Sequence, residues 1–368
     1  MTQPALDAAV LEPTTPRRRS RWRWLMLAAG LIVIALAAGW TVLWYTLARD
    51  VERVVDDWVA ARRTEGYFIV LGAPHVSGFP FRLTLRFELP VAALRGSSTL
   101  SWHADWIEAS APLWAPQQIR VRVPRNLFTY SVRGASRDIQ VISEAARFDV
   151  TANGSGRPET AVIALAQPRL HMNLLAQPIA ARDLEIALTW PQLLPGEPFP
   201  RAAVSLAASE VTSALPHFAA IGRTIQSLRG NVVFRGTWDN QDWRRALVAW
   251  RDNGGTIDLQ GLRLEWGNLK VDGDGTAALD RELRPIGAGA LWVLGLPEFI
   301  DSLQRLGVVN ARGAALFKLA LSAMPSNGGK TQLPISAQDG RLYLGPVAVA
   351  PLWSLDSFSL DGVLRPTN

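Results

Sequence analysis

Hydrophobic and polar residues alternate along most of the chain after Tyr67. In VSGFPFRLTLRFELP, residues 76–90, every second residue from Phe81 to Leu89 is Phe or Leu, and those between are Arg, Thr and Glu. The alternation recurs at residues 119–123, 170–174 and 184–190. Because successive side chains of a strand point to opposite faces, this period predicts half-buried strands. We therefore predict a mainly β (α+β) fold of long antiparallel, curved sheets with a few packing helices.

The segment from residue 254 to residue 280 predicts further strands with a local irregularity. Its alternation slips by one position at Gln260 and Gly261, which predicts a β-bulge. Turns are predicted at Gly267 and Asn268, and again near residues 272–275. Residues 341–352 repeat the order of a strand, a glycine-containing turn and a strand.

Three segments carry apolar residues at helical spacing instead: residues 216–228, 241–252 and 297–306. Pro297 suits a first helical position, and Gly307 suits a stop. The proline-rich stretch at residues 190–201 divides the β-rich part into a first half, 67–190, and a second half with helices, 202–368. One continuous sheet and two separate domains both fit this pattern.

Residues 24–48 form an uncharged apolar run near the N-terminus. An α-helix needs about 20 apolar residues to cross the hydrocarbon core of a bilayer, so this run predicts a single transmembrane anchor. A cleaved signal peptide is the alternative, because residues 35–37 resemble a small-residue cleavage site. The apolar run continues well beyond that site and is too long for the usual apolar region of a signal peptide.

The flanks of the run predict its orientation. Five arginines precede it, whereas Arg49 and Arg53 after it are balanced by Asp50 and Glu52. By the positive-inside rule, the basic tail of residues 1–23 stays cytoplasmic and the rest of the chain is exported. Aromatic residues at both ends suit the two membrane interfaces. The residues assigned to these interfaces are Arg17, Arg18, Arg19, Trp22, Trp24, Trp40, Trp44 and Tyr45.

Residues 49–66, after the anchor, predict an amphipathic helix that ends near Gly66. Apolar stripes of this kind usually face a protein core, which favours docking on the first sheet. The alternative is that the apolar stripe lies on the membrane surface. In either case this helix leads the chain from the membrane into the β-rich part.

The charge distribution argues against nucleic-acid binding. The whole chain carries +6, and residues 1–24 contribute +3 of it, from five Arg against Asp7 and Glu12. The remaining residues therefore also carry only +3, without a long basic run or a basic helix. The chain has no cysteine, which excludes disulfides, thiolate metal sites and a cysteine nucleophile.

Catalytic and metal-binding signatures are absent or incomplete. Residues 329–331 end like a phosphate loop, but Met324 stands where its first glycine is required. Residues 272–275 resemble a calcium loop without the terminal glutamate, so a hairpin turn explains them better. His103 and Asp105 are a candidate ligand pair without a third ligand nearby. We therefore predict a protein that is not an enzyme and has no metal or cofactor.

The candidate functional motif is GFPFR, comprising Gly78, Phe79, Pro80, Phe81 and Arg82. Gly78 permits a close backbone approach, and the fixed φ of Pro80 pushes Phe79 towards an extended conformation. The structural interpretation is the bent start of a strand. The functional alternative is that Phe79 and Phe81 line an opening that accepts lipid beside the membrane.

GFPFRL at residues 78–83, together with residues 254–280, IGAGALWVLGLPEFIDSL and DGRLYLGPVAVAPL, resembles the alphaproteobacterial family catalogued as domain of unknown function 2125. The similarity extends over nearly all of residues 49–355. The resemblance implies no activity and no site residues, because that family has no established ones. More distantly, the anchor followed by amphipathic strands is similar to the AsmA-type envelope proteins, which implies a β-groove associated with envelope lipids.

Three functional hypotheses follow. The first is a protein of the bacterial inner membrane, with a periplasmic β-rich domain, that binds or transfers a lipid-like molecule. The second is a non-enzymatic scaffold whose sheets bind a protein partner in the envelope. The third is an envelope hydrolase, which requires polar side chains that converge in a pocket. An apolar concavity would favour the first hypothesis over the second.

Overall fold

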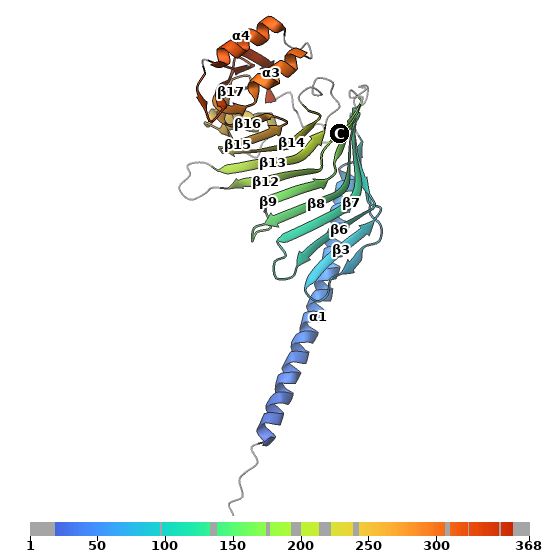
Figure 1. Ribbon diagram of the computed structural model, residues 1–368. Coiled ribbons are helices and arrows are strands. Elements are labelled where there is room, and N and C mark those ends of the chain that lie inside the picture. The colour runs from blue at the N-terminus through green and yellow to red at the C-terminus, as the bar shows by residue number, and fades with distance from the viewer. Residues whose placement is uncertain are drawn as a thin grey trace, which may run out of the picture. The chain divides into compact units, whose positions relative to one another are not determined.

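The computed structural model describes residues 19–95, 98–132, 138–173, 177–192, 200–212, 222–237, 243–305, 310–322, 324–345 and 347–355 (Figure 1). The chain divides into two compact units, residues 1–53 and residues 54–368. All the described strands belong to the second unit. The predicted division near residues 190–201 is therefore not a boundary between compact units.

The strands alternate with short turns over most of the second unit. They are β1 (Tyr67–Val70), β2 (His75–Ser77), β3 (Arg82–Glu88), β4 (Val91–Arg95), β5 (Ser98–Ala104), β6 (Trp106–Pro112), β7 (Gln118–Val132), β8 (Asp138–Ala152), β9 (Pro158–Ala166), β10 (Arg169–Met172), β11 (Ile179–Ala180), β12 (Asp183–Gln192), β13 (Arg201–Thr212), β14 (Thr224–Arg235), β15 (Thr256–Trp266), β16 (Leu269–Leu279), β17 (Pro285–Leu294), β18 (Ser326–Asn327), β19 (Lys330–Gln338), β20 (Arg341–Leu344) and β21 (Val347–Pro351). All pairings between the described strands are antiparallel. The predicted mainly β, antiparallel fold is confirmed.

The helix α1 (Arg19–Thr64) runs without a break through the predicted anchor and the predicted amphipathic helix. Its 46 residues correspond to about 69 Å at 1.5 Å per residue. Within the second unit, its last turns pack against the start of the sheet. Val59 is buried, and the guanidinium of Arg63 donates to the Ile69 carbonyl oxygen at 2.6 Å from Nη2. The two predicted helices are therefore one.

The sheet is a ladder of neighbouring strands with two long strands near one end. Each half of β7 pairs with a different short strand, β6 along its first half and β5 along its second. On its other side β7 pairs with β8 along nearly its full length. From β8 the ladder continues through β9, β12, β13, β14, β15, β16, β17 and β19 to β20 and β21. Figure 1 shows β7, β8, β9, β12 and β13 side by side.

Three clusters of buried side chains stabilise the two ends of this ladder. Towards the N-terminal end, Ala104 of β5 packs with Val123 and Ala146 of β7 and β8. Towards the C-terminal end, α2 (Trp243–Asp252) contributes Leu247 and Trp250 to a second cluster. The helices α3 (Leu296–Arg305) and α4 (Ala311–Ser322) cover the ends of β15, β16, β17 and β19 and form the third. Helices α2 and α3 match the predicted segments 241–252 and 297–306, whereas α4 was not predicted.

Two local predictions are wrong. Residues 224–228, the second part of the predicted helix 216–228, belong to β14, because β13 and β15 supply hydrogen-bonding partners on both of its sides. Residues 216–221, the start of that predicted helix, lie outside the described residues. Residues 272–275 are not a turn but lie inside β16. The bulge is confirmed, since the register of β15 and β16 shifts between Leu259 and Leu262.

The buried face of β3 is also shorter than predicted. Leu85 and Phe87 are buried and Leu83 is partly buried, but Phe81 and Leu89 are exposed at its two ends. Leu89 has a positive φ of 48°. This left-handed conformation takes the chain out of the strand direction, so the alternation no longer orients the Leu89 side chain.

Candidate functional site

One face of the central strands is apolar across strand after strand. The register places three rows of mainly aliphatic side chains on this face, which we call the apolar face. The rows are Ile119, Val150, Ala161, Leu188, Val204 and Val232; Val121, Phe148, Ile163, Ile186, Leu206 and Gly230; and Val123, Ala146, Leu165, Leu184, Ala208 and Leu228. Most of these residues on β9, β12, β13 and β14 are partly exposed rather than buried.

Buried clusters of described residues cover the apolar face at its two ends, and none of these clusters lies over its middle. The cluster around Ala104 and Val123 covers its β7 and β8 end, with Trp102 packed against it. The clusters built by α2, α3 and α4 lie over β15, β16, β17 and β19. Among the described residues, none of β12 or β13 belongs to a buried cluster. The middle of the face is therefore an apolar surface between two packed regions.

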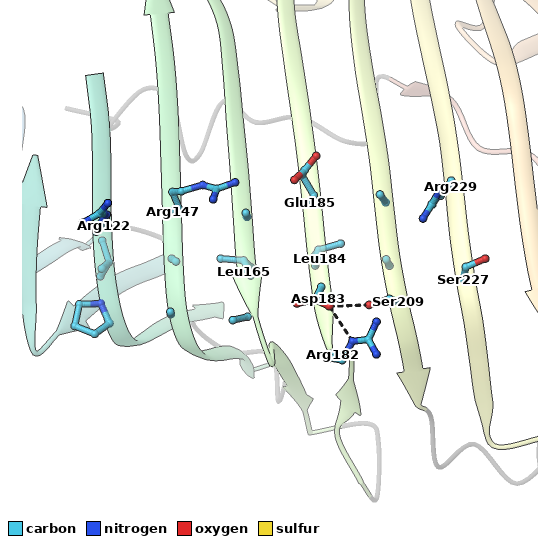
Figure 2. Close-up of a pocket in the computed structure, with 18 of the residues that line it drawn as sticks. Arg122, Arg147, Leu165, Arg182, Asp183, Leu184, Glu185, Ser209, Ser227 and Arg229 are labelled. Carbon is cyan, nitrogen blue, oxygen red and sulfur yellow. Dashed lines mark hydrogen bonds and ion pairs between the residues drawn. The ribbon is translucent and has the colours of Figure 1, made fainter. Parts of the chain in front are cut away.

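The opposite face carries a hollow of about 1020 Å³, which we call the arginine-lined hollow (Figure 2). Val123, Ala146, Leu165, Leu184 and Ala208 line it in part, and two register rows that carry its charged side chains cross it. They are Arg122, Arg147, Ala164, Glu185, Ala207 and Arg229; and Pro124, Ala145, Ala166, Asp183, Ser209 and Ser227. The hollow exists because β9 and β13 contribute mainly alanine between strands with longer side chains.

Charges of both signs line the hollow. Arg147 pairs with Asp149 at 2.9 Å, while Arg122 and Glu108 are 3.9 Å apart. The hydrogen bond from Arg182 lowers the pKa of Asp183, and a second one from Ser209 adds to this effect. Such paired charges are typical of a solvated polar surface. The hollow therefore combines charged groups with alanine and other apolar side chains, whereas the three rows of the apolar face carry no charged side chain.

A further charged group lies on β16, outside the hollow. Asp272 accepts hydrogen bonds from Lys330 at 2.6 Å and from Arg263 at 3.2 Å. The hydrogen bond from Lys330 is the main reason that the pKa of Asp272 is lowered. Its folded-state pKa therefore lies below the ordinary value of about 3.9. The stability that this interaction contributes is present above that value and is lost as the pH falls through the folded-state pKa.

Replacing Lys330 with methionine should lower the free energy of unfolding at neutral pH by at most about 1 kcal/mol, because both side chains are partly exposed. The difference from the wild-type chain should shrink as the pH falls below about 4. Urea unfolding of the full chain in detergent over an acid series measures this. Lys270→Met is the control, since Lys270 is exposed and has no ion pair among the described residues. An equal, pH-independent loss in both variants would contradict the prediction.

The GFPFR motif forms the loop between β2 and β3. Gly78 has a φ of +100°, and a Cβ there would lie 2.7 Å from the Arg82 carbonyl oxygen. The Arg82 amide donates to the Gly78 carbonyl oxygen at 2.9 Å, which closes the loop. The peptide bond between Phe79 and Pro80 is cis. The loop therefore has a defined geometry that needs glycine at its first position.

The loop presents its aromatic side chains outwards. Phe79 is 51 % exposed and Phe81 is 63 % exposed. Trp114, in the loop between β6 and β7, is 70 % exposed, and its ring meets that of Phe81 edge-on at 6.4 Å. We call Phe79, Phe81 and Trp114 the aromatic tip. The contribution of Trp114 was not predicted, since 31 residues separate it from Arg82 in the chain.

The residues assigned to the membrane interfaces differ in exposure. Arg17 and Arg18 lie outside the described residues, and Arg19 is the first residue of α1. Trp22, Trp24, Trp40 and Tyr45 are exposed, whereas Trp44 is 5 % exposed. The rings of Trp44 and Tyr45 meet edge-on at 5.1 Å. Among the described residues, α1 is the one helix that is long and apolar enough to cross a membrane.

The candidate metal ligands do not come together. Asp105 forms an ion pair with Arg125 at 2.9 Å, so its carboxylate already has a partner. Within the described ranges, no three His, Asp or Glu side chains are arranged to hold a metal ion. The candidate calcium loop at residues 272–275 lies in the middle of a strand, with Asp272 paired to Lys330.

A family model described as an uncharacterized protein conserved in bacteria, DUF2125, matches residues 44–352. The chain belongs to the DUF2125 family. The predicted resemblance to this family is therefore confirmed, and the match covers every strand of the sheet. No curated protein and no solved structure matches the chain. The similarity of this DUF2125 chain to AsmA-type proteins stays a prediction.

Proposed function

We propose that this DUF2125 protein is anchored in the bacterial inner membrane by α1 and binds lipid acyl chains on its apolar face. The basic N-terminal tail lies in the cytoplasm, and the β-rich unit lies in the periplasm. Five arginines before the apolar run, against a balanced flank after it, support this orientation. The protein holds or transfers lipid and catalyses no reaction.

The observation that carries this proposal is the uncovered middle of the apolar face. Soluble domains rarely leave a contiguous apolar surface exposed, and a large one usually marks a binding site. Here the rows cross six neighbouring strands, β7, β8, β9, β12, β13 and β14. At about 4.8 Å between strands, the uncovered part on β9, β12, β13 and β14 extends over about 14 Å. The hydrocarbon part of one leaflet is about 15 Å thick, so this part is about as long as an acyl chain in one leaflet.

The distribution of charged side chains favours lipid binding over the scaffold hypothesis. The side chains of the three rows are uncharged, whereas the opposite face carries paired arginines and carboxylates. A protein partner would be expected to use hydrogen bonds as well as apolar contacts. The three rows contain no polar side chain, which suits hydrocarbon better.

Replacing Ile186 with aspartate should reduce bound lipid at least about tenfold, a change of about 1.4 kcal/mol in binding free energy. The carboxylate would lie in the middle row, where an acyl chain cannot hydrate it. The measurement is native mass spectrometry of the full chain released from detergent, followed by lipid extraction. Ala187→Asp is the matched control, because Ala187 is the next residue on β12 and points to the opposite face.

Two outcomes would overturn the proposal. One is a wild-type chain without bound lipid that also takes up no labelled lipid from vesicles. The other is an equal loss of lipid in the Ile186 and Ala187 variants, which would place the lipid elsewhere. The first outcome would favour the scaffold hypothesis, in which the sheets bind a protein partner in the envelope.

A further inference from the structure

The aromatic tip is an exposed apolar patch that the core does not need. Its three side chains are more than half exposed, although aromatic rings normally bury most of their area. Phe81 and Trp114 contact each other edge-on, so each ring covers part of the other. More than half of the surface of each of the three residues still faces solvent.

The backbone holds these rings in place. The Leu113 amide donates to the Phe81 carbonyl oxygen at 3.1 Å, which continues the pairing of β3 with β6 for one more residue. The Ala115 amide donates to the Pro112 carbonyl oxygen at 3.1 Å and closes the second loop. With the closed loop at Gly78, two sheet-anchored loops present one aromatic patch. A rigid presentation lowers the entropy that contact with a partner would cost.

The row of the apolar face that begins at Ile119, which we call the outer row, lies near one end of its strands. The aromatic tip lies at the same end of the sheet. Arg82 at the start of β3 pairs with Pro112 at the end of β6, and Gln118 at the start of β7 pairs with Thr151 near the end of β8. The outer row begins at Ile119, the next residue of β7, which is itself exposed. The loops of the tip therefore border the end of the sheet where an acyl chain would reach this row.

We propose that the aromatic tip inserts into the surface of the bilayer in which α1 is anchored. This inference rests on the proposed role of α1 as an anchor. Trp and other aromatic side chains favour the interface between headgroups and hydrocarbon, because their rings are apolar and the indole N–H can still form hydrogen bonds there. The anchor ties the second unit to that surface, since 30 residues separate Ala48 at the end of the apolar run from Phe79. Contact at the tip gives acyl chains a path to the apolar face without crossing water.

Because the chain has no cysteine, one introduced cysteine can carry a spin label. The label then reports how deeply the aromatic tip enters the bilayer. A single Ala115→Cys substitution in the full chain carries a spin label beside Trp114, and Gln177→Cys places the same label at the opposite strand end. In nanodiscs of neutral phosphatidylcholine, power saturation compares collisions with oxygen, which partitions into the bilayer, and with a water-soluble nickel chelate. The ratio of oxygen to nickel collisions should be severalfold higher at position 115 than at position 177.

Adding Phe79→Ser and Phe81→Ser to the Ala115→Cys chain should lower its ratio to that of position 177. Because both side chains are exposed, these changes should leave the urea midpoint nearly unchanged. A ratio at position 115 that equals that at position 177, or that the serine substitutions do not lower, would overturn the inference. Bound lipid in the same samples tests the proposed function separately. Lipid retained with a water-exposed tip would leave lipid binding intact and remove only the membrane contact.

Discussion

Replacing Trp250 with alanine should lower the free energy of unfolding of the second unit by about 3–5 kcal/mol. Trp250 is 1 % exposed and belongs to the cluster that α2 forms with Leu279 and Leu283. Its ring also packs on Gly236 and Gly255, where an added Cβ would lie 2.4 Å and 2.3 Å from ring atoms. The backbone is therefore shaped around the indole, and the cavity left by alanine cannot easily collapse.

Urea unfolding of the full chain in detergent, followed by circular dichroism of the sheet, measures this loss. Trp353→Ala is the matched control, because Trp353 is 68 % exposed and should change stability by less than about 0.5 kcal/mol. Similar losses in the two variants would mean that α2 does not pack on the sheet through Trp250. A loss confined to the Trp250 variant supports this helix as a stabilising cover.

Replacing Val233 with aspartate should be at least as damaging, with a loss of about 4 kcal/mol or more. Val233 is 0 % exposed and lies directly opposite Asp258 on β15. Asp258 is itself buried and already accepts hydrogen bonds from Arg235 and Thr276. A second carboxylate at this position would be buried beside a like charge whose nearest donors are engaged.

Asn231→Asp provides the control for charge alone. Asn231 is two residues earlier on β14, on the same face as Val233, and is only partly buried. Its replacement should change the free energy of unfolding by about 0.5 kcal/mol or less. The same urea titration serves both variants. Equal effects would mean that the position of Val233 is not closed to solvent and that the register of β14 and β15 is different.

The strands could be predicted from the sequence because their signal is local. The alternation at residues 184–190 depends only on which side chains a single strand directs to each face, and the structure places this segment in β12 as predicted. Residues 224–228, within the predicted helix 216–228, were predicted wrongly because Ile225 and Leu228 are also compatible with helical spacing. Hydrogen bonds with β13 and β15, which lie outside this segment, stabilise a strand here instead of a helix.

The candidate site was predictable in composition but not in position. The apolar residues of each strand could be assigned to one face, yet the rows exist only because the register aligns Ile163, Ile186 and Leu206. Arg147 and Arg229 give no local signal for a shared hollow, since the strands between them bring in Ala164 and Ala207. Likewise, pairing of β3 with β6 brings Trp114 to Phe81.

The sequence by itself determined the apolar segment of α1, the period of the strands and the polarity of their faces, because each depends on neighbours within one element. Only the tertiary structure decided the order of the strands, the uncovered middle of the apolar face and the aromatic tip. These depend on hydrogen bonds between segments far apart in the chain, and a shift of one residue in register would turn a strand's side chains to the other face. The position of the apolar face in this DUF2125 protein is therefore set by how its strands pair.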